Sequence, residues 1–258
     1  VAIGGISYDN CDYLKDTGVD GIAVVSAIFA SDDCALATRK LFVKTRELFG
    51  KKRNIIMDMD GTLADSMPFW KKSAREYAIL RGADIPDNFD EITGVMDLND
   101  YAEYVKNVLG IDTNLEQITE AAVEIMNKHY EKDIPAKDGM TELVTREYKA
   151  GSRLVVFTAS DRRSVEILLS HLGIRECFYD IYTVYDVGLK KSDKNSYLKV
   201  AELAGMKDTS QVWVYEDILR GVKAAKEAGL NVCAVYDEDS AGDWKDIKEL
   251  ADKTLELV

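Results

Sequence analysis

Two aspartates one residue apart end an apolar run in the stretch IIMDMDGTLADS, residues 55–66. Alternate residues of a strand point the same way, so Asp58 and Asp60 can present both carboxylates to one place before the turn at Gly61. Two carboxylates this close repel each other unless a proton or a cation intervenes. Mg²⁺ is such a cation, and it leaves a carboxylate oxygen free to attack phosphorus. An Asp-rich turn closed by glycine fits this short pattern equally well, so further residues have to decide.

The stretch resembles the first motif of the haloacid dehalogenase-like superfamily, whose hydrolases carry an Asp-x-Asp-Gly-Thr signature after an apolar strand. Three later segments match the other motifs of this family in order: VVFTAS contributes Thr158, LKKSDKNSYLKVAELAG contributes Lys191, and VWVYEDILRGVKAAKEAGL contributes Glu216 and Asp217. The resemblance covers residues 53–258. Four motifs in the right order are far more specific than any one of them.

The resemblance implies catalytic roles for four of these residues. Asp58 is expected to attack the phosphoryl group and form an aspartyl-phosphate. Asp60 is expected to protonate the leaving oxygen and later to deprotonate the attacking water. Thr158 and Lys191 are expected to hold the oxygens of the transferring phosphoryl group, where they offset developing negative charge.

The resemblance also implies an Mg²⁺ site built from oxygen ligands. Asp58, the backbone carbonyl of Asp60 and Asp217 are the expected ligands, and Glu216 is expected to bind directly or through water. The chain departs from the family pattern at Ile218, which replaces the serine that usually follows the acidic pair. The outer shell of the metal site is therefore left open by the sequence.

Two neighbouring lysines compete for the phosphate-binding position. The prolines that usually follow the lysine of this family are replaced by Ser192 and Lys194, so the motif alone does not separate Lys190 from Lys191. Alignment to the following segment SYLKVAEL favours Lys191.

Four further residues are candidates for substrate binding. Gly61 follows Asp60 directly, Ala159 and Ser160 follow Thr158, and Trp70 stands in the first helix of the predicted insertion. The neighbouring aromatic residues Phe69 and Tyr77 are better explained as packing residues.

The second aspartate and the insertion narrow the reaction. Relatives that cleave carbon–halogen bonds lack the aspartate at the position of Asp60, so a dehalogenase is disfavoured. The insertion resembles the cap of the beta-phosphoglucomutase-like branch. In those mutases a histidine and a phosphate-binding arginine stand where this chain has Trp70 and Asp97. Water is therefore the expected phosphoryl acceptor.

The elements that must position these residues alternate along the chain. The segments SRLVVFT, FYDIYTV, QVWVYED and NVCAVYD are strand-like and are separated by helical patterns, and RNIIMDMD (53–60) is a further strand. Short apolar strands that alternate with helices predict an α/β fold, a Rossmann-like doubly wound parallel sheet with helices on both faces. In such sheets the ligand site lies at the carboxyl ends of the strands.

Three regions are expected. Residues 67–135 show helical spacing throughout and contain or border all three prolines, so we expect an inserted α-helical cap there. Residues 51–66 and 136–258 are expected to form the hydrolase core. Residues 1–50 form a strand-helix-strand-helix series.

Composition limits the partners. With 46 acidic and 33 basic residues the formal net charge is -13, which disfavours nucleic acid and anionic membrane surfaces as partners and leaves small phosphorylated metabolites. The four cysteines are widely spaced and there are only two histidines, which argues against a zinc site, a disulfide framework or a Ser-His triad. No apolar run is long enough to span a membrane and no leader is evident, so we expect a cytoplasmic location.

Residues 1–50 resemble the last two strand-helix units of thiamin-phosphate synthase, a TIM barrel. The segments VAIGGI and GVDGIAVVSAIF carry the resemblance, and Gly4, Gly5 and Ser26 match the backbone phosphate cradle of that family. A generic strand-helix pair is the alternative. Because two exposed parallel strand edges invite association, we expect this segment to pack on the hydrolase or to mediate self-association.

Together these features predict a Mg²⁺-dependent phosphatase that acts on a small phosphorylated metabolite through an aspartyl-phosphate. Thiamin monophosphate is one candidate substrate because the synthase makes it, and sugar phosphates and nucleotides are the others. A phosphomutase of the same family and a non-catalytic module that binds a phosphometabolite are the alternatives.

Overall fold

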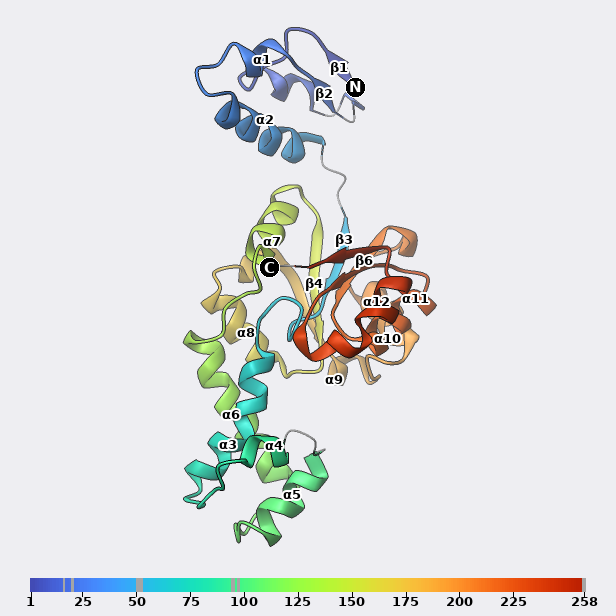
Figure 1. Ribbon diagram of the computed structural model, residues 1–258. Coiled ribbons are helices and arrows are strands. Elements are labelled where there is room, and N and C mark those ends of the chain that lie inside the picture. Colours follow the sequence, from blue (N-terminus) through green and yellow to red (C-terminus); the bar gives the residue numbers. More distant parts are fainter. Residues whose placement is uncertain (16, 20, 50–52, 94–95, 97, 257–258) are drawn as a thin grey trace.

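The computed structural model describes residues 1–15, 17–19, 21–49, 53–93, 96 and 98–256. Its main feature is a six-stranded, fully parallel sheet with the strand order β5-β4-β3-β6-β7-β8 (Figure 1). The strands are β3 (Asn54–Met57), β4 (Arg153–Thr158), β5 (Phe178–Thr183), β6 (Val212–Glu216), β7 (Asn231–Val235) and β8 (Lys253–Leu255). The first strand of this sheet in the sequence, β3, lies inside it, with β4 and β5 on one side and β6, β7 and β8 on the other. The predicted doubly wound α/β fold is therefore confirmed.

Helices cover both faces of the sheet. α7 (Met140–Lys149) and α8 (Arg162–His171) pack on one face, and α10 (Lys194–Leu203), α11 (Leu219–Glu227) and α12 (Trp244–Leu250) pack on the other. The central strand shows why both faces need cover. Ile55 and Met57 belong to the first apolar cluster, whereas Ile56 belongs to the second, because successive side chains of a strand alternate. The sequence analysis did not predict α7, α12 or β8.

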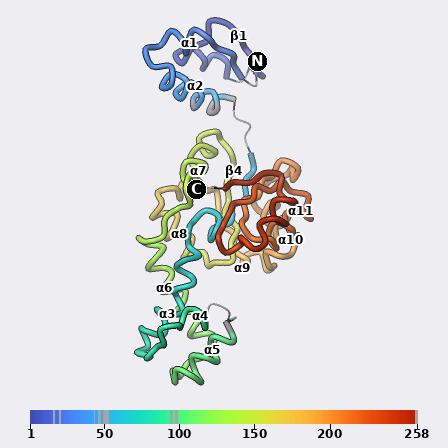
Figure 2. Tube along the Cα trace, viewed as in Figure 1, coloured from blue at the N-terminus to red at the C-terminus, as the bar shows by residue number. Residues whose placement is uncertain are grey.

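Between β3 and α7 the chain leaves the sheet and returns (Figure 2). This stretch contains α3 (Met67–Leu80), α4 (Phe89–Thr93), α5 (Leu98–Asn107) and α6 (Leu115–Lys132). Tyr77, Phe89 and Ile118 belong to an apolar cluster of its own, as the helical spacing requires. The C-terminal half of α6 differs, because Met126 and Tyr130 belong to the first apolar cluster, together with residues of α7 and α8. Of these four helices the sequence analysis missed α4.

The remaining short elements are α9 (Val184–Val187), η1 (Cys11–Leu14), η2 (Arg175–Cys177), η3 (Thr209–Gln211) and η4 (Glu238–Asp243). Across the described residues, no helix combines the length and apolar character needed to cross a lipid bilayer. The cytoplasmic location stays a prediction.

The N-terminal segment, residues 1–49, contains β1 (Ala2–Ile3), β2 (Ile22–Ala23), α1 (Ser26–Phe29) and α2 (Cys34–Phe49). The two strands pair in parallel over two residues each, and η1 lies between them in the sequence. The predicted strands here are therefore much shorter than their apolar runs. A two-residue pairing offers little surface for packing, and the strand residue Ile3 remains 78% exposed.

Candidate active site

The carboxyl ends of three adjacent strands bring the predicted residues together. Asp58 directly follows β3, Thr158 ends β4, and Glu216 ends β6 with Asp217 after it. Because β3 lies between β4 and β6 in the sheet, these side chains meet at one edge.

Lys191 lies at the centre of this edge. Its Nζ is 2.6 Å from Asp58 Oδ1 and 2.8 Å from Glu216 Oε2, and all three side chains are buried. Burial alone would lower the pKa of Lys191, but the negative charges of Asp58 and Glu216 outweigh it and hold the pKa well above its usual value. The neighbouring Lys190 is exposed at the rim, so the structure brings Lys191 and not Lys190 to Asp58.

The turn after β3 holds Asp217 against the site. Thr62 Oγ1 donates to Asp217 Oδ1 at 2.8 Å and lies 3.5 Å from Asp58 Oδ2. Gly61 has a φ of 81°, and a Cβ built on it would overlap the Asp217 carboxylate. The glycine therefore serves both the turn and the close approach of the carboxylate.

Three carboxylates form a group that could hold a metal ion. One oxygen from each of Asp58, Glu216 and Asp217 lies within 4.8 Å of the others. In the described part of the chain, Glu216 Oε1 is buried without a hydrogen-bond partner. Burial and the charge of Asp58 raise the pKa of Glu216 well above its usual value and the pKa of Asp217 to about 8. One lysine thus leaves negative charge uncompensated, and an oxygen-ligated divalent cation would fit this set.

Asp60 lies beside this cluster in a different environment. Its Oδ1 accepts hydrogen bonds from Ser66 Oγ at 2.6 Å, from Trp70 Nε1 at 3.3 Å and from the Tyr130 hydroxyl. Its Oδ2 accepts from Ser160 Oγ at 2.6 Å. Removal from water raises the pKa of Asp60, and these hydrogen bonds offset part of that rise.

The candidate substrate-binding residues fall in three different surroundings. Ala159 lines the cavity at the strand ends. Ser160 and Trp70 contact Asp60, and Trp70 lines a separate cavity between the helices of the insertion together with Tyr77 and Tyr101. Gly61 contacts Asp217.

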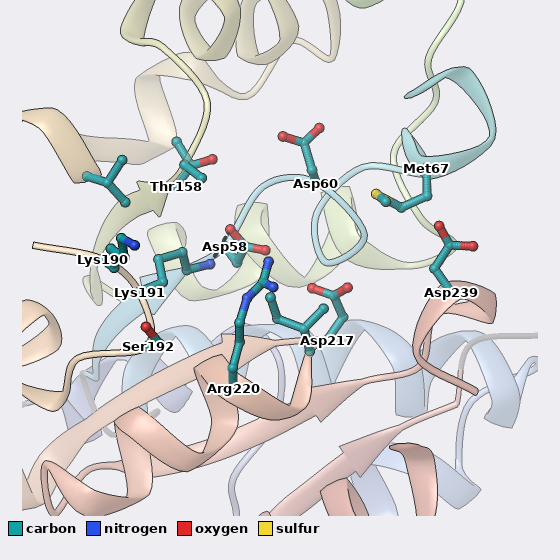
Figure 3. A pocket seen from close by; sticks show the side chains of 13 residues that line it. Asp58, Asp60, Met67, Thr158, Lys190, Lys191, Ser192, Asp217, Arg220 and Asp239 are labelled. Carbon is teal, nitrogen blue, oxygen red and sulfur yellow. Dashed lines mark ion pairs between the residues drawn. The ribbon is translucent and has the colours of Figure 1, made fainter. Parts of the chain in front are cut away.

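A cavity of about 540 Å³ opens at this edge (Figure 3). Its lining includes Asp58, Asp60, Thr158, Lys191 and Asp217. Figure 3 shows these side chains around a common space, together with Arg220 from the first turn of α11. Glu216 lies beneath, against Gly221, rather than in the lining.

Sequence reasoning missed Thr62, Ser66, Tyr130 and Arg220. Thr62 is part of the Asp-x-Asp-Gly-Thr signature and could have been named from it. Arg220 stands three residues after Asp217 and lines the cavity. Tyr130 carried no local signal, because it lies 70 residues from Asp60 in the sequence.

A family profile described as haloacid dehalogenase-like hydrolase matches residues 55–235. The chain belongs to this family. The matched range includes β3, the helical insertion and the strands through β7, and therefore the whole cluster around Asp58.

Individual relatives agree with this assignment. Fructose-1-phosphate phosphatase YqaB from Escherichia coli is 26% identical over 196 residues, which cover 73% of this chain and 98% of that protein. Protein SUPPRESSOR OF QUENCHING 1, chloroplastic, from Arabidopsis thaliana is 29% identical over 195 residues, and the match spans only 18% of its length. A crystal structure from Thermotoga maritima, assigned as a beta-phosphoglucomutase, aligns with a TM-score of 0.67 and 22% identity over 79% of this chain and 94% of its own. At that identity the structural match shows the shared fold.

The N-terminal segment has a different relative. Thiamine-phosphate synthase from Pyrococcus furiosus is 48% identical over 50 residues, which are 19% of this chain and 24% of that protein. The segment is therefore similar to about a quarter of a synthase.

Proposed function

We propose that this protein is a Mg²⁺-dependent phosphatase that hydrolyses a small phosphorylated metabolite through an aspartyl-phosphate on Asp58. One observation carries the proposal. The Asp58 carboxylate, fixed by Lys191, faces a cavity of about 540 Å³ that Asp60, Thr158 and Asp217 also line. A nucleophile, a proton-transfer group and phosphate-binding groups are then available to one substrate.

Each side chain has a task that its contacts allow. Asp58 attacks phosphorus, and Lys191 neutralises charge on a phosphoryl oxygen. Thr158 Oγ1 accepts the Ser160 N–H at 3.0 Å, which leaves its own hydroxyl hydrogen for a second phosphoryl oxygen. Asp60 gives a proton to the leaving oxygen and later takes one from water.

Asp58, the backbone carbonyl of Asp60 and Asp217 would hold the Mg²⁺, with Glu216 close enough to bind directly or through water. The ion would supply charge neutralisation for the phosphoryl group and the carboxylates. The unpartnered Glu216 oxygen and the all-oxygen donor set support this choice of metal.

The enzyme is a phosphoric monoester hydrolase, as relatives named as phosphatases indicate. Fructose-1-phosphate phosphatase and the phosphorylated carbohydrates phosphatase from Thermotoga maritima favour phosphorylated sugars as the first substrates to test. The synthase-like segment adds thiamin monophosphate as a specific candidate.

The test is release of inorganic phosphate from p-nitrophenyl phosphate, fructose 1-phosphate and thiamin monophosphate, with Mg²⁺ and with a chelator. We expect Mg²⁺-dependent release that Asp58→Asn abolishes. Isomerised product without free phosphate would instead identify a phosphomutase. Substrate binding without turnover would identify a binding module.

A further inference from the structure

Two helices of the insertion reach into the active site at Asp60. Trp70 belongs to α3 and Tyr130 to α6, and both donate to Asp60 Oδ1. Trp70 Nε1 also lies 3.2 Å from the Tyr130 hydroxyl oxygen. Tyr130 is fully buried, so its hydroxyl has no access to solvent.

The chemistry of the donors fixes the direction of these bonds. An indole N–H can only donate, so the hydroxyl oxygen of Tyr130 accepts from Trp70 and its own hydrogen points to Asp60. Ser66 adds a third donor to the same oxygen, Oδ1. Among the described residues, Oδ2 has only Ser160 as a partner, whose hydroxyl can donate or accept. A proton on the Asp60 carboxyl group therefore belongs on Oδ2.

This arrangement suits an in-line displacement. The leaving oxygen lies opposite the attacking oxygen across the phosphorus atom, so the acid must stand beyond the nucleophile. Figure 3 shows the Asp60 carboxylate directed away from the Asp58 carboxylate, and Asp60 is among the residues that line the cavity.

We propose that Trp70 and Tyr130 are positioning residues that hold Asp60 by Oδ1 and leave Oδ2 as the atom that exchanges the proton. The inference rests on the proposed function. In the first step an Asp58 oxygen bonds to phosphorus, the bond from phosphorus to the leaving oxygen breaks, and the Oδ2 proton moves to that oxygen. In the second step a water oxygen bonds to phosphorus, one proton of that water moves to Oδ2, and the bond from Asp58 to phosphorus breaks.

The experiment uses the full chain with Mg²⁺ and compares two aryl phosphates that differ only in a para nitro group. Phenyl phosphate needs more proton transfer to its leaving oxygen than p-nitrophenyl phosphate, whose leaving anion is stabilised by the nitro group. The quantity measured is kcat/KM, because it reports only steps up to release of the phenol. In Tyr130→Phe and Trp70→Phe we expect kcat/KM for phenyl phosphate to fall by about tenfold more than for p-nitrophenyl phosphate, a part of what a general acid contributes.

Tyr77→Phe is the matched control. It removes a buried hydroxyl from the same helix, α3, where Tyr77 bonds to Thr113 and not to Asp60. We expect the wild-type ratio of the two substrates in this variant. Thermal unfolding identifies any variant that fails to fold. If one of Tyr130→Phe and Trp70→Phe does not fold, the other carries the test.

Equal losses on both substrates, or an unchanged ratio, in the folded variants would overturn the inference. The proposed function would survive that result as long as the wild-type enzyme releases phosphate and Asp58→Asn does not. If the wild-type enzyme releases none, the proposed function itself fails.

Discussion

At the carboxyl edge of the six-stranded sheet charged side chains are buried, whereas in the N-terminal segment apolar side chains are exposed. Lys191 and Glu216 are 8% and 0% exposed as side chains. Ile3, Val25 and Phe29 are 78%, 71% and 75% exposed. The two regions thus reverse the usual distribution of polar and apolar groups, for different reasons.

The sheet can bury charges because the surrounding core is large. Two extensive apolar clusters flank its strands, and they supply the free energy that a group of buried carboxylates costs. The N-terminal segment has only a two-stranded sheet, and among its described side chains the buried ones are Cys11 and Leu41. A two-stranded sheet is marginal by itself, which supports the proposal that the segment associates with another surface.

The largest expected effect is at Lys191. Lys191→Met should lower phosphatase activity by at least about 10²-fold and destabilise the protein by about 3–5 kcal/mol, because Asp58 and Glu216 would remain buried without their positively charged partner. Chemical denaturation without added metal measures the stability. Lys190→Met is the control, since Lys190 is exposed, and an equal loss there would contradict the difference between the two lysines.

Gly61→Ala tests the close packing of the same edge. The substitution should cost more than about 1 kcal/mol and reduce activity, because the residue has a φ of 81° and its Cβ would displace the Asp217 carboxylate. Gly82→Ala is matched to it, with a φ of 76° and no atom within 4 Å of the added Cβ. The difference between the melting temperatures of the two variants measures the effect of the overlap with Asp217 alone. Similar melting temperatures and full activity of Gly61→Ala would contradict the close packing at this position.

A substitution at His129 tests an ion-pair group that is less buried than the charges of the active site. The ring lies 2.9 Å from Asp133 and 3.0 Å from Glu76, which joins α6 to α3. Burial lowers the pKa of His129, but the two carboxylates outweigh it and raise the pKa in the folded state. The stabilisation is therefore complete below the ordinary pKa of about 6.5 and is lost as pH rises through the raised value.

Melting temperatures of the wild type and of His129→Gln, compared across this range, measure the effect. We expect the difference in melting temperature to be widest at low pH. It should correspond to no more than about 1 kcal/mol in the free energy of unfolding, since both carboxylates are more than a third exposed. A gap that widens with rising pH would contradict the sign.

Removal of residues 1–52 should have the smallest effect on catalysis. The residues that surround the cavity at Asp58 all come from position 58 onward, so kcat/KM for p-nitrophenyl phosphate should stay within about twofold. Sedimentation should detect self-association of the full chain and none of the shortened chain. A monomeric full chain would refute self-association, and a monomer in which residues 1–50 are also mobile would refute packing on the hydrolase as well. A large loss of activity would show that the two regions act together.

Much of the fold follows from local pattern. The apolar strands and the helices between them predicted the order of β3 to β7, because strand and helix periods are written in consecutive residues. Local pattern did not predict how short the pairing of β1 with β2 is, and it did not predict α12 or β8 near the C-terminus. Their extent depends on which surfaces they meet, as tertiary packing overrides local propensity.

The sequence by itself determined the family and the residues at the strand ends, because motif order along a parallel sheet maps onto neighbouring strand ends. For the two lysines, alignment favoured Lys191, and the tertiary structure decided the matter, since it buries the Lys191 side chain against Asp58 and leaves Lys190 exposed. It also decided that Trp70 and Tyr130 hold Asp60. That contact joins residues far apart in the chain, and only the packing of α3 against α6 brings them together.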